Sequence, residues 1–224
     1  MKNMWLVFRL MLSPGFIDLL ILWNRGLRQL GWPESARTKT PTNQEGPLPW
    51  LTYGAIDYLD QIVSVDEKVL EIGGGSSTRW WRGRGNHVTV VESDMSWFES
   101  IRGIADESHL CKTSQDVFRL LKEKAHSRKK YGVVVVDGVE PRSDYLALAS
   151  RMVSDGGILV VDNSEREDYA AEMNKLGNFQ RLDFFGLGPS NRYAWCTSVF
   201  FQTPPRVGGR SRLATYVTTK RLPG

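Results

Sequence analysis

The chain has 224 residues, of which 41% are hydrophobic and 24% are charged, a composition typical of one globular domain with extensions. These values argue against a disordered or collagen-like chain, and two cysteines are too few for a disulfide framework or a multi-cysteine zinc site. Residues 1–50 carry six Lys and Arg against three Asp and Glu, and residues 204–224 carry five against none. Because the net charge of the whole chain is +4, the middle segment, residues 51–203, has a net charge of −4. Because the middle is mildly acidic, we expect no nucleic-acid partner.

The amino-terminal segment, residues 1–49, predicts a helix followed by an extended connection. Its apolar stretches are interrupted by Arg9 and Pro14, so neither a membrane-spanning helix nor a signal peptide fits them. Ser and Pro at positions 13 and 14 are typical of a helix start, and apolar side chains then recur at helical spacing as far as Leu30. Residues 33–49 are rich in Pro and Thr, which predicts a linker or an extended lid.

Two interpretations of this helix stay open. Amphipathic helices mostly face a core, so the helix packs on its own domain or on a second subunit, which would make the protein a homo-oligomer. Aromatic side chains together with Arg25 and Arg28 also suit a helix that lies in a membrane interface through residues 14–30. The expected location is the cytoplasm, with membrane association under the second interpretation. The basic tail, residues 204–224, suits contact with an anionic surface or a solvated end.

Residues 50–203 alternate between short apolar runs, typical of strands, and longer helical patterns. The expected strands are 68–72, 88–92, 109–111, 133–137, 158–162, 179–185 and 195–202, and the expected helices are 51–63, 96–104, 116–125, 144–153 and 165–176. This alternation predicts a parallel sheet covered on both faces. The last two strands have no helix between them, so we expect an antiparallel edge. The predicted fold is α/β, with a Rossmann-like, mostly parallel sheet of seven strands.

The end of the first strand carries a glycine-rich turn. In an open α/β sheet the ligand lies beyond the carboxyl ends of the strands. There, Glu71 is followed by Gly73, Gly74 and Gly75 and by a helix start that includes Ser77. Glycine lets the backbone turn sharply and approach a ligand without a Cβ clash. The turn is therefore a candidate ligand loop.

The second strand ends at Glu92, 19 residues after Gly73, which is close to the spacing of a nucleoside-binding unit. A carboxylate at that place can accept both hydroxyls of a ribose. A dinucleotide site would want a third glycine at position 78, which is Thr78, and Glu71 would repel a pyrophosphate. A nicotinamide (NAD)-dependent oxidoreductase is therefore the alternative enzyme, and a non-catalytic scaffold with this fold is the third interpretation.

These motifs resemble those of the class I S-adenosylmethionine-dependent methyltransferases over about residues 50–202. Glu71, Gly73 and Gly75 are similar to the first motif of that family, which implies that the loop holds the methionine end, with Glu71 at its amino group. Glu92 is similar to the ribose-binding acid of the second motif. The adenine-contacting loop of the small O-methyltransferases is similar to the run Ser114, Gln115 and Asp116.

A closer resemblance is to small bacterial O-methyltransferases of unassigned substrate, some linked to sugar or glycan pathways. It is carried by Asp137-Gly138, by Asp162-Asn163 and by the region from Phe185-Gly186 to Ser198. The resemblance implies that S-adenosylmethionine is the cofactor. It also implies O-methylation of a hydroxyl on a small molecule or on a sugar or glycan.

In the catechol-type members of the family, an Asp after the fourth strand and an Asp-Asn pair after the fifth hold Mg²⁺. Asp137, Asp162 and Asn163 stand at the matching positions, so the resemblance implies a magnesium site. The family's catalytic Lys is replaced here by Glu140, and Asn163 alternatively only ends its strand before a helix cap. The predicted catalytic residues are Asp137, as the base, and Glu140. The other interpretation of Asp137 is an anchor for the cofactor loop.

Overall fold

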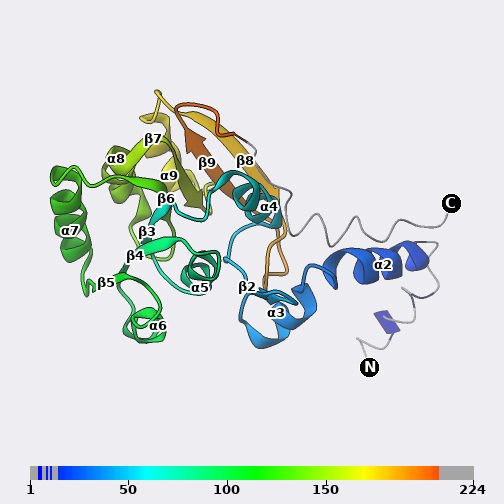
Figure 1. Cartoon of the computed structure of the whole chain (residues 1–224). Coiled ribbons are helices and arrows are strands. Elements are labelled where there is room, and N and C mark those ends of the chain that lie inside the picture. The colour runs from blue at the N-terminus through cyan, green and yellow to red at the C-terminus, as the bar shows by residue number, and fades with distance from the viewer. Residues whose placement is uncertain (1–4, 7–8, 10, 12–14, 207–224) are drawn as a thin grey trace.

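A computed structural model describes residues 5–6, 9, 11 and 15–206. Its main feature is a seven-stranded sheet with the order β5-β4-β3-β6-β7-β9-β8 (Figure 1). The strands are β3 (Lys68–Ile72), β4 (His87–Glu92), β5 (Glu107–Leu110), β6 (Tyr131–Val136), β7 (Val153–Asp162), β8 (Gln180–Gly186) and β9 (Trp195–Phe201). The first five are parallel, and β9 runs antiparallel to both β7 and β8. The predicted α/β fold with its antiparallel edge is confirmed.

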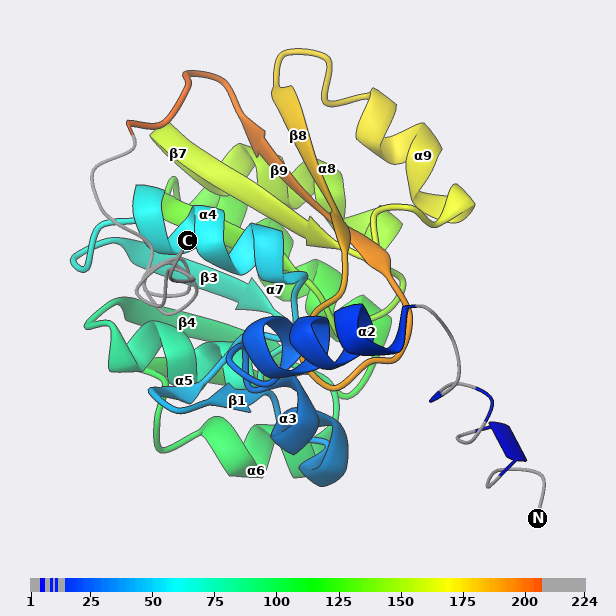
Figure 2. The ribbon, with the colours of Figure 1, turned by 90° about the vertical axis from the view of Figure 1, so that its right-hand side faces the viewer.

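Helices cover both faces of the sheet (Figure 2). One core contains side chains of α4 (Tyr53–Ile62), α5 (Ser76–Gly83) and α6 (Met95–Ile101), and the other contains side chains of α7 (Ser114–His126), α8 (Arg142–Met152) and α9 (Glu167–Asn174). Successive strand residues point to opposite faces, so a strand between two cores must be apolar throughout. This explains the four consecutive valines at positions 133–136 of β6, which are all buried.

The order of the strands reverses between β3 and β6, which are neighbours in the sheet but far apart in sequence. Their carboxyl ends lie side by side, and the Asp137 amide donates to the Ile72 carbonyl at 2.9 Å. On the other side of β3, the Gly73 amide donates to the Val91 carbonyl of β4 at 2.8 Å. Open α/β sheets bind ligands outside such a reversal, so the candidate loop lies where this topology favours a site.

The connection before α4 differs from the predicted linker. Over residues 33–49 the structure has α3 (Trp32–Thr38) and a hairpin of β1 (Thr42–Asn43) and β2 (Gly46–Pro47). The buried Ser35 joins them, because its hydroxyl donates to the Thr42 carbonyl at 2.8 Å and accepts from the Thr42 amide at 2.9 Å. A composition rich in Pro and Thr does not reveal these tertiary contacts.

The predicted amino-terminal helix is present as α2 (Phe16–Leu22), continued by a π-helical turn, η1 (Trp23–Leu27). Its predicted start at positions 13 and 14, and the tail beyond position 206, lie outside the described residues. No residue of α2 is buried, so α2 does not pack into the core of its own domain. Within the part of the chain that the structure describes, no helix is long and apolar enough to cross a membrane.

Candidate functional site

The glycine loop after β3 is tightly packed against two neighbouring segments. Gly73 has a φ of +100°, and a Cβ there would collide with the backbone carbonyl of Asp137. A Cβ on Gly74 would collide with the Ile101 side chain. Glycine is therefore required at both positions. The Gly74 amide donates to Glu92 Oε2 at 2.8 Å, which ties the loop to the end of β4.

Glu92 is fixed in place by the backbone around it. Its Oε1 accepts from the amides of Ser93 and Asp94, at 2.6 and 2.8 Å, and the side chain is only 4% exposed. Oε2 accepts the single bond from Gly74, so lone-pair positions of the carboxylate remain for a ligand hydroxyl. Such a fixed, ionisable acceptor suits a ribose.

The loop and Glu92 line a cavity of about 470 Å³, within the usual range of about 300–1,000 Å³ for small-molecule sites. Most of the residues predicted for the site meet here: Gly73, Gly74, Gly75, Ser77, Glu92, Asp137, Asp162 and Asn163. The remaining lining comes from residues that sequence reasoning did not assign to the cofactor: Trp50, Ser76, Ser93, Asp94, Trp97, Gly138, Asn191 and Tyr193.

Glu71 lies behind the loop and is fully buried. Its Oε2 accepts from the Thr78 hydroxyl at 2.6 Å, and that hydroxyl in turn accepts from the Gly75 amide at 3.1 Å. Burial raises the pKa of Glu71 to about 7, although the hydrogen bond from Thr78 opposes the shift. Within the described residues Glu71 Oε1 has no hydrogen-bond partner. The side chain supports the loop from behind and is not among the residues that line the cavity, so its contact with a methionine ammonium group stays a prediction.

The predicted adenine-contacting run does not line this cavity. Ser114 and Gln115 are exposed at the start of α7. Thr113 caps α7 by accepting from the Asp116 amide at 3.1 Å, and the Asp116 carboxylate accepts from the Thr113 hydroxyl at 2.7 Å and pairs with Arg119 at 2.6 Å. The contact of Ser114, Gln115 and Asp116 with adenine stays a prediction.

Trp97 of α6 lies beside the glycine loop, since a Cβ on Gly75 would lie 3.4 Å from its ring. The ring is 43% exposed and lines the cavity. Asp94 caps α6 by accepting from the amides of Ser96 and Trp97 at 2.8 and 2.9 Å, which fixes the tryptophan directly after Glu92. In the sequence, an Asp three positions before a Trp is typical of a helix N-cap, which indicates that the Trp lies in the first turn of a helix.

The predicted metal ligands surround an arginine. The guanidinium of Arg142 pairs with Asp137 Oδ1 at 3.0 Å and donates to Asn163 Oδ1 at 2.8 Å and to the Asp162 carbonyl at 2.9 Å. Arg142 is itself buried, and its charge takes the place that a cation would need among these oxygens. Within the described residues, no cluster of His, Cys, Asp or Glu is arranged to hold a metal ion. The residues thus do not fit the Mg²⁺ that the resemblance implied.

Asp162 is held by the antiparallel edge of the sheet. Its Oδ1 accepts from Trp195 Nε1 at 3.0 Å and from the Thr197 hydroxyl at 2.6 Å, both on β9. Burial, followed by repulsion from Asp137, raises the pKa of Asp162 to about 8 despite these bonds. Burial also raises the pKa of Asp137, against the attraction of Arg142. Burial thus shifts the pKa values of both acids upward, in the direction that favours accepting a proton.

Glu140, the other predicted catalytic residue, points into an ion-pair cluster and does not line the cavity. Its Oε1 pairs with Arg166 at 2.9 Å and accepts from the Tyr169 hydroxyl at 3.0 Å. It also lies 3.5 Å from Arg142 Nε. In this structure Glu140 positions Arg142, and its own contact with a reacting group stays a prediction.

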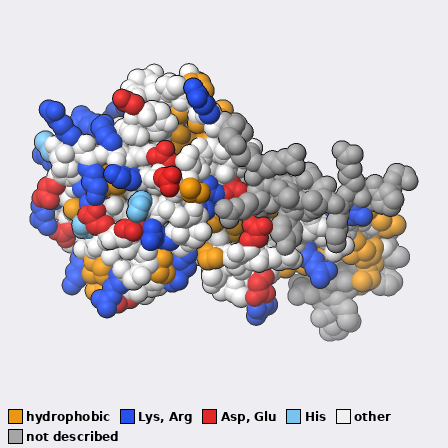
Figure 3. Space-filling model, in the orientation of Figure 1, with side chains coloured by type: hydrophobic (Ala, Val, Ile, Leu, Met, Phe, Trp, Pro, Cys, Tyr) orange, Lys and Arg blue, Asp and Glu red, His pale blue; other side chains and the backbone are white. Residues whose placement is uncertain are grey.

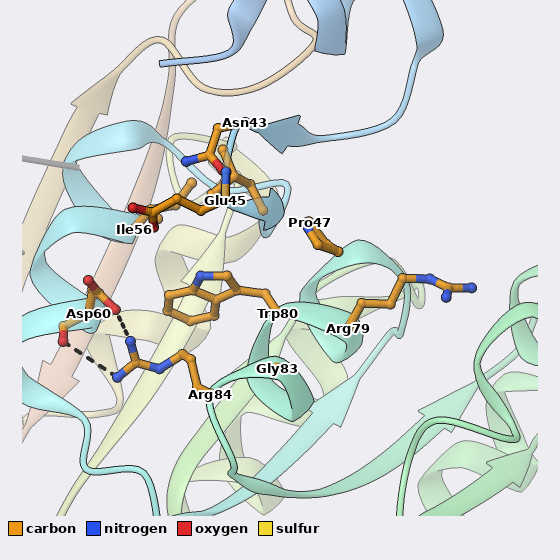
Figure 4. Close-up of a pocket in the computed structure, with 10 residues that line it drawn as sticks. Asn43, Glu45, Pro47, Ile56, Asp60, Arg79, Trp80, Gly83 and Arg84 are labelled. Atoms are coloured by element: carbon orange, nitrogen blue, oxygen red, sulfur yellow. Dashed lines mark hydrogen bonds and ion pairs between the residues drawn. The ribbon is translucent and has the colours of Figure 1, made fainter. Parts of the chain in front are cut away.

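A second, smaller hollow of about 90 Å³ lies between α4, α5 and the β1–β2 hairpin (Figure 4). Trp80 stands over Arg84 there, with the guanidinium carbon 4.8 Å from its ring, and Arg84 forms a buried ion pair with Asp60. Trp81, which follows Trp80 in the chain, is buried in the core. Trp80 therefore lines this hollow and not the cavity at the glycine loop.

The fold of this chain is similar to that of methyltransferases of known structure. The chain is similar in structure to an O-methyltransferase from Bacillus cereus in complex with SAH: at 12% identity the match covers 82% of this chain and 96% of that chain, with a TM-score of 0.52. At 12% identity, this likeness shows a similar fold and nothing more. No protein-family model and no curated protein matches the sequence.

Two further solved structures are more distant. The O-methyltransferase TomG from Streptomyces achromogenes, in complex with SAM, is 18% identical over 69% of this chain and 77% of that chain, with a TM-score of 0.48. A putative SAM-dependent methyltransferase from Streptococcus mutans is 13% identical over 64% of this chain, with a TM-score of 0.44. The match covers 46% of the Streptococcus mutans protein, which is less than half of its length.

Proposed function

We propose that this chain is an S-adenosylmethionine-dependent methyltransferase that methylates a hydroxyl of a small molecule or of a sugar or glycan. The observation that carries the proposal is the cavity at the strand reversal, where the glycine loop is bonded directly to Glu92. Its volume suits a nucleoside, and its walls supply a close backbone approach on one side and a fixed carboxylate on the other. The likeness to methyltransferase folds agrees with this assignment.

The residues of the cavity suit the parts of S-adenosylmethionine in turn. Glu92 would accept the ribose hydroxyls, and the exposed ring of Trp97 would stack on the adenine. The backbone of the glycine loop, which a ligand can approach without a Cβ clash, would lie against the methionine end, and the carboxylate of Glu71 behind the loop would attract its ammonium group. The cofactor, when bound, supplies an electrophilic methyl group on a sulfonium sulfur.

The acceptor would enter beside Trp50, Asn191 and Tyr193, which line the same cavity. Aromatic and amide side chains of this kind suit a ring that carries hydroxyls, such as a sugar. The acceptor oxygen would form a bond to the methyl carbon as the carbon–sulfur bond breaks. Asp137 would take the hydroxyl proton, and Arg142 would hold that carboxylate in position.

The cofactor assignment is tested by calorimetry on Glu92→Ala. Loss of charge-assisted bonds to the ribose should weaken the affinity for S-adenosylhomocysteine by about ten- to a hundredfold. Glu99→Ala is the matched control, because Glu99 lies nearby on α6 and, among the residues that the structure describes, pairs with the exposed Arg102 alone. Unchanged affinity in Glu92→Ala would remove the ribose role. Stabilisation of the wild-type protein by NAD and not by S-adenosylhomocysteine would favour the oxidoreductase, and a response to neither would favour the scaffold.

The base assignment is tested separately with Asp137→Asn. An amide keeps the shape of the side chain but accepts no proton at neutral pH, so turnover should fall by about a hundredfold or more while cofactor affinity stays within a few fold. The measurement is single-turnover methyl transfer to an acceptor found by screening small hydroxyl compounds and sugars. Full activity in Asp137→Asn would show that another group takes the proton.

A further inference from the structure

The segment before α3 exposes an unusual run of apolar side chains. Six consecutive or nearly consecutive residues are between 43% and 69% exposed: Ile17, Leu19, Leu20, Ile21, Leu22 and Trp23. In Figure 1 the helix α2 projects away from the sheet, and Figure 3 shows hydrophobic side chains gathered over it. Apolar patches of this kind on a protein surface mark a binding surface.

The apolar residues of α2 occupy every side of the helix and not one stripe, because residues 19–22 follow one another directly. A second protein copy packed against one side would leave the other sides exposed. A helix that is apolar on all sides is instead stable when it is immersed in hydrocarbon, as it would be where it inserts into a bilayer. The shape of the patch therefore favours a lipid surface over a paired helix.

The charges around α2 are complementary to anionic lipid. Residues 1–33 contain four Lys and Arg against Asp18 alone. Within the described part of the chain, neither Arg25 nor Arg28 is paired with a carboxylate, and Arg28 donates only to Asn24, at 3.3 Å. Trp23 stands two positions before Arg25, and Trp with Arg is the combination found at the headgroup level of membranes.

This segment is fastened to the mouth of the cavity. The ring of Trp23 contacts that of Trp32 edge-on, with the centroids 6.2 Å apart. Trp32 Nε1 donates to the carbonyl of Asn191 at 2.8 Å, and the neighbouring Ser190 hydroxyl donates to the Ser35 carbonyl at 2.9 Å. Asn191 lines the cavity. A surface bound by α2 would therefore lie beside the loop through which the acceptor is proposed to enter.

We propose that residues 16–28 dock the protein onto an anionic lipid bilayer and so turn the mouth of the cavity toward that surface. The docking itself does not depend on the proposed methyl transfer. It combines insertion of α2 with attraction of Arg25 and Arg28 to lipid phosphates, so it weakens as salt rises.

The test is flotation of the full chain with vesicles of phosphatidylcholine alone or with added phosphatidylglycerol. The wild type should float with the anionic vesicles and less so at high salt, and the double variant Leu20→Glu/Ile21→Glu should bind about tenfold more weakly or not at all. Phe118→Glu is the control, because Phe118 is 43% exposed on α7 and is not part of this segment. Equal flotation of wild type and double variant, or an equal loss in the control, would overturn the proposal.

Two further measurements distinguish a lipid surface from a second copy of the chain, and the docking from the cofactor assignment. A concentration-dependent dimer that forms without lipid and that Leu20→Glu/Ile21→Glu abolishes would overturn the proposal in favour of a second copy. Stabilisation by S-adenosylhomocysteine, measured on the same variants, should be unchanged, so failure of the docking and failure of the cofactor assignment are distinguishable.

The orientation is tested with a fluorophore on Tyr193→Cys, at the rim, and on Phe118→Cys, away from it. Both native cysteines are buried, so labelling is selective. Anionic vesicles should shield the label at position 193 from an aqueous quencher and leave the label at 118 exposed. Equal quenching at both positions would overturn the orientation.

Discussion

Arg142 lies where the resemblance implied a magnesium ion. One guanidinium contacts Asp137, the Asp162 carbonyl and Asn163, and it is itself held by Glu140. Arginine suits this position because its planar fork donates in several directions and keeps its charge when buried. The positive charge that the acids need is thus supplied by the chain.

This arrangement predicts a metal-independent protein. Excess EDTA should leave the melting temperature and any methyl transfer unchanged, and Mg²⁺ should not stabilise the wild type. Arg142→Ala should lower the free energy of unfolding by about 1–3 kcal/mol, because it removes the ion pair with the partly exposed Asp137 and leaves the Asp162 carbonyl and Asn163 Oδ1 without their donor. Arg166→Ala, which removes an exposed partner of the same Glu140, is the control and should have a much smaller effect. Magnesium-dependent activity in the wild type would contradict this interpretation.

Glu71 is a buried acid whose pKa is raised to about 7. A group with a raised pKa in the folded state contributes its full stability below its unfolded pKa, near 4.5, and loses it as the pH rises through 7. Glu71→Gln keeps the acceptor for Thr78 but carries no charge. Its stability relative to the wild type should therefore increase between pH 5 and pH 8, by about 1–3 kcal/mol.

Denaturant unfolding of Glu71→Gln and wild type at the two pH values checks this expectation. The other buried acids titrate in both proteins, so their contribution cancels in the difference. A gap that stays constant with pH would show that Glu71 is ionised in the folded protein throughout. The same variant tests ligand binding, since loss of affinity for S-adenosylhomocysteine would place the methionine ammonium at this carboxylate.

At the scale of elements, the strand–loop–helix unit of β3 and α5 depends on the close approach of two backbones. Gly73→Ala would place a methyl group against the Asp137 carbonyl at a positive φ, so it should cost at least about 2 kcal/mol of stability. Gly83→Ala is the matched control, because its Cβ would meet open space at the end of α5. Thermal melts of both variants check the difference, and equal melting temperatures would contradict the close approach.

Some helices and strands could be predicted from the sequence, and others could not. Residues 68–72 form a strand with the predicted bounds, because an apolar run that ends in glycines has few alternatives. The linker predicted over residues 33–49 is instead α3 and a hairpin, because Ser35, Thr42 and the loop at Ser190 supply bonds from distant parts of the chain. Local composition does not indicate hydrogen bonds between distant parts of the chain.

At the scale of the whole molecule, the sheet order brings distant residues to one cavity. Glu92, Asp137 and Asp162 end three strands that the sequence already predicted, and all three line the cavity. The run 114–116 also follows a predicted strand, yet Ser114 and Gln115 remain exposed at the start of α7. Position after a strand is thus a good guide to the cavity near the strand reversal, whereas the adenine contact of the run 114–116 stays a prediction.

The sequence by itself determined the layered α/β fold, the antiparallel edge and the glycine loop with its acid on the next strand. Each follows from a local pattern: strand runs, helical spacing, and the lack of a Cβ at a sharp turn. Only the tertiary structure decided that Arg142 lies among Asp137, Asp162 and Asn163, and that the apolar side chains of α2 stay exposed. The physical reason is that both depend on which distant groups come within bonding range, and spacing along the chain does not specify that.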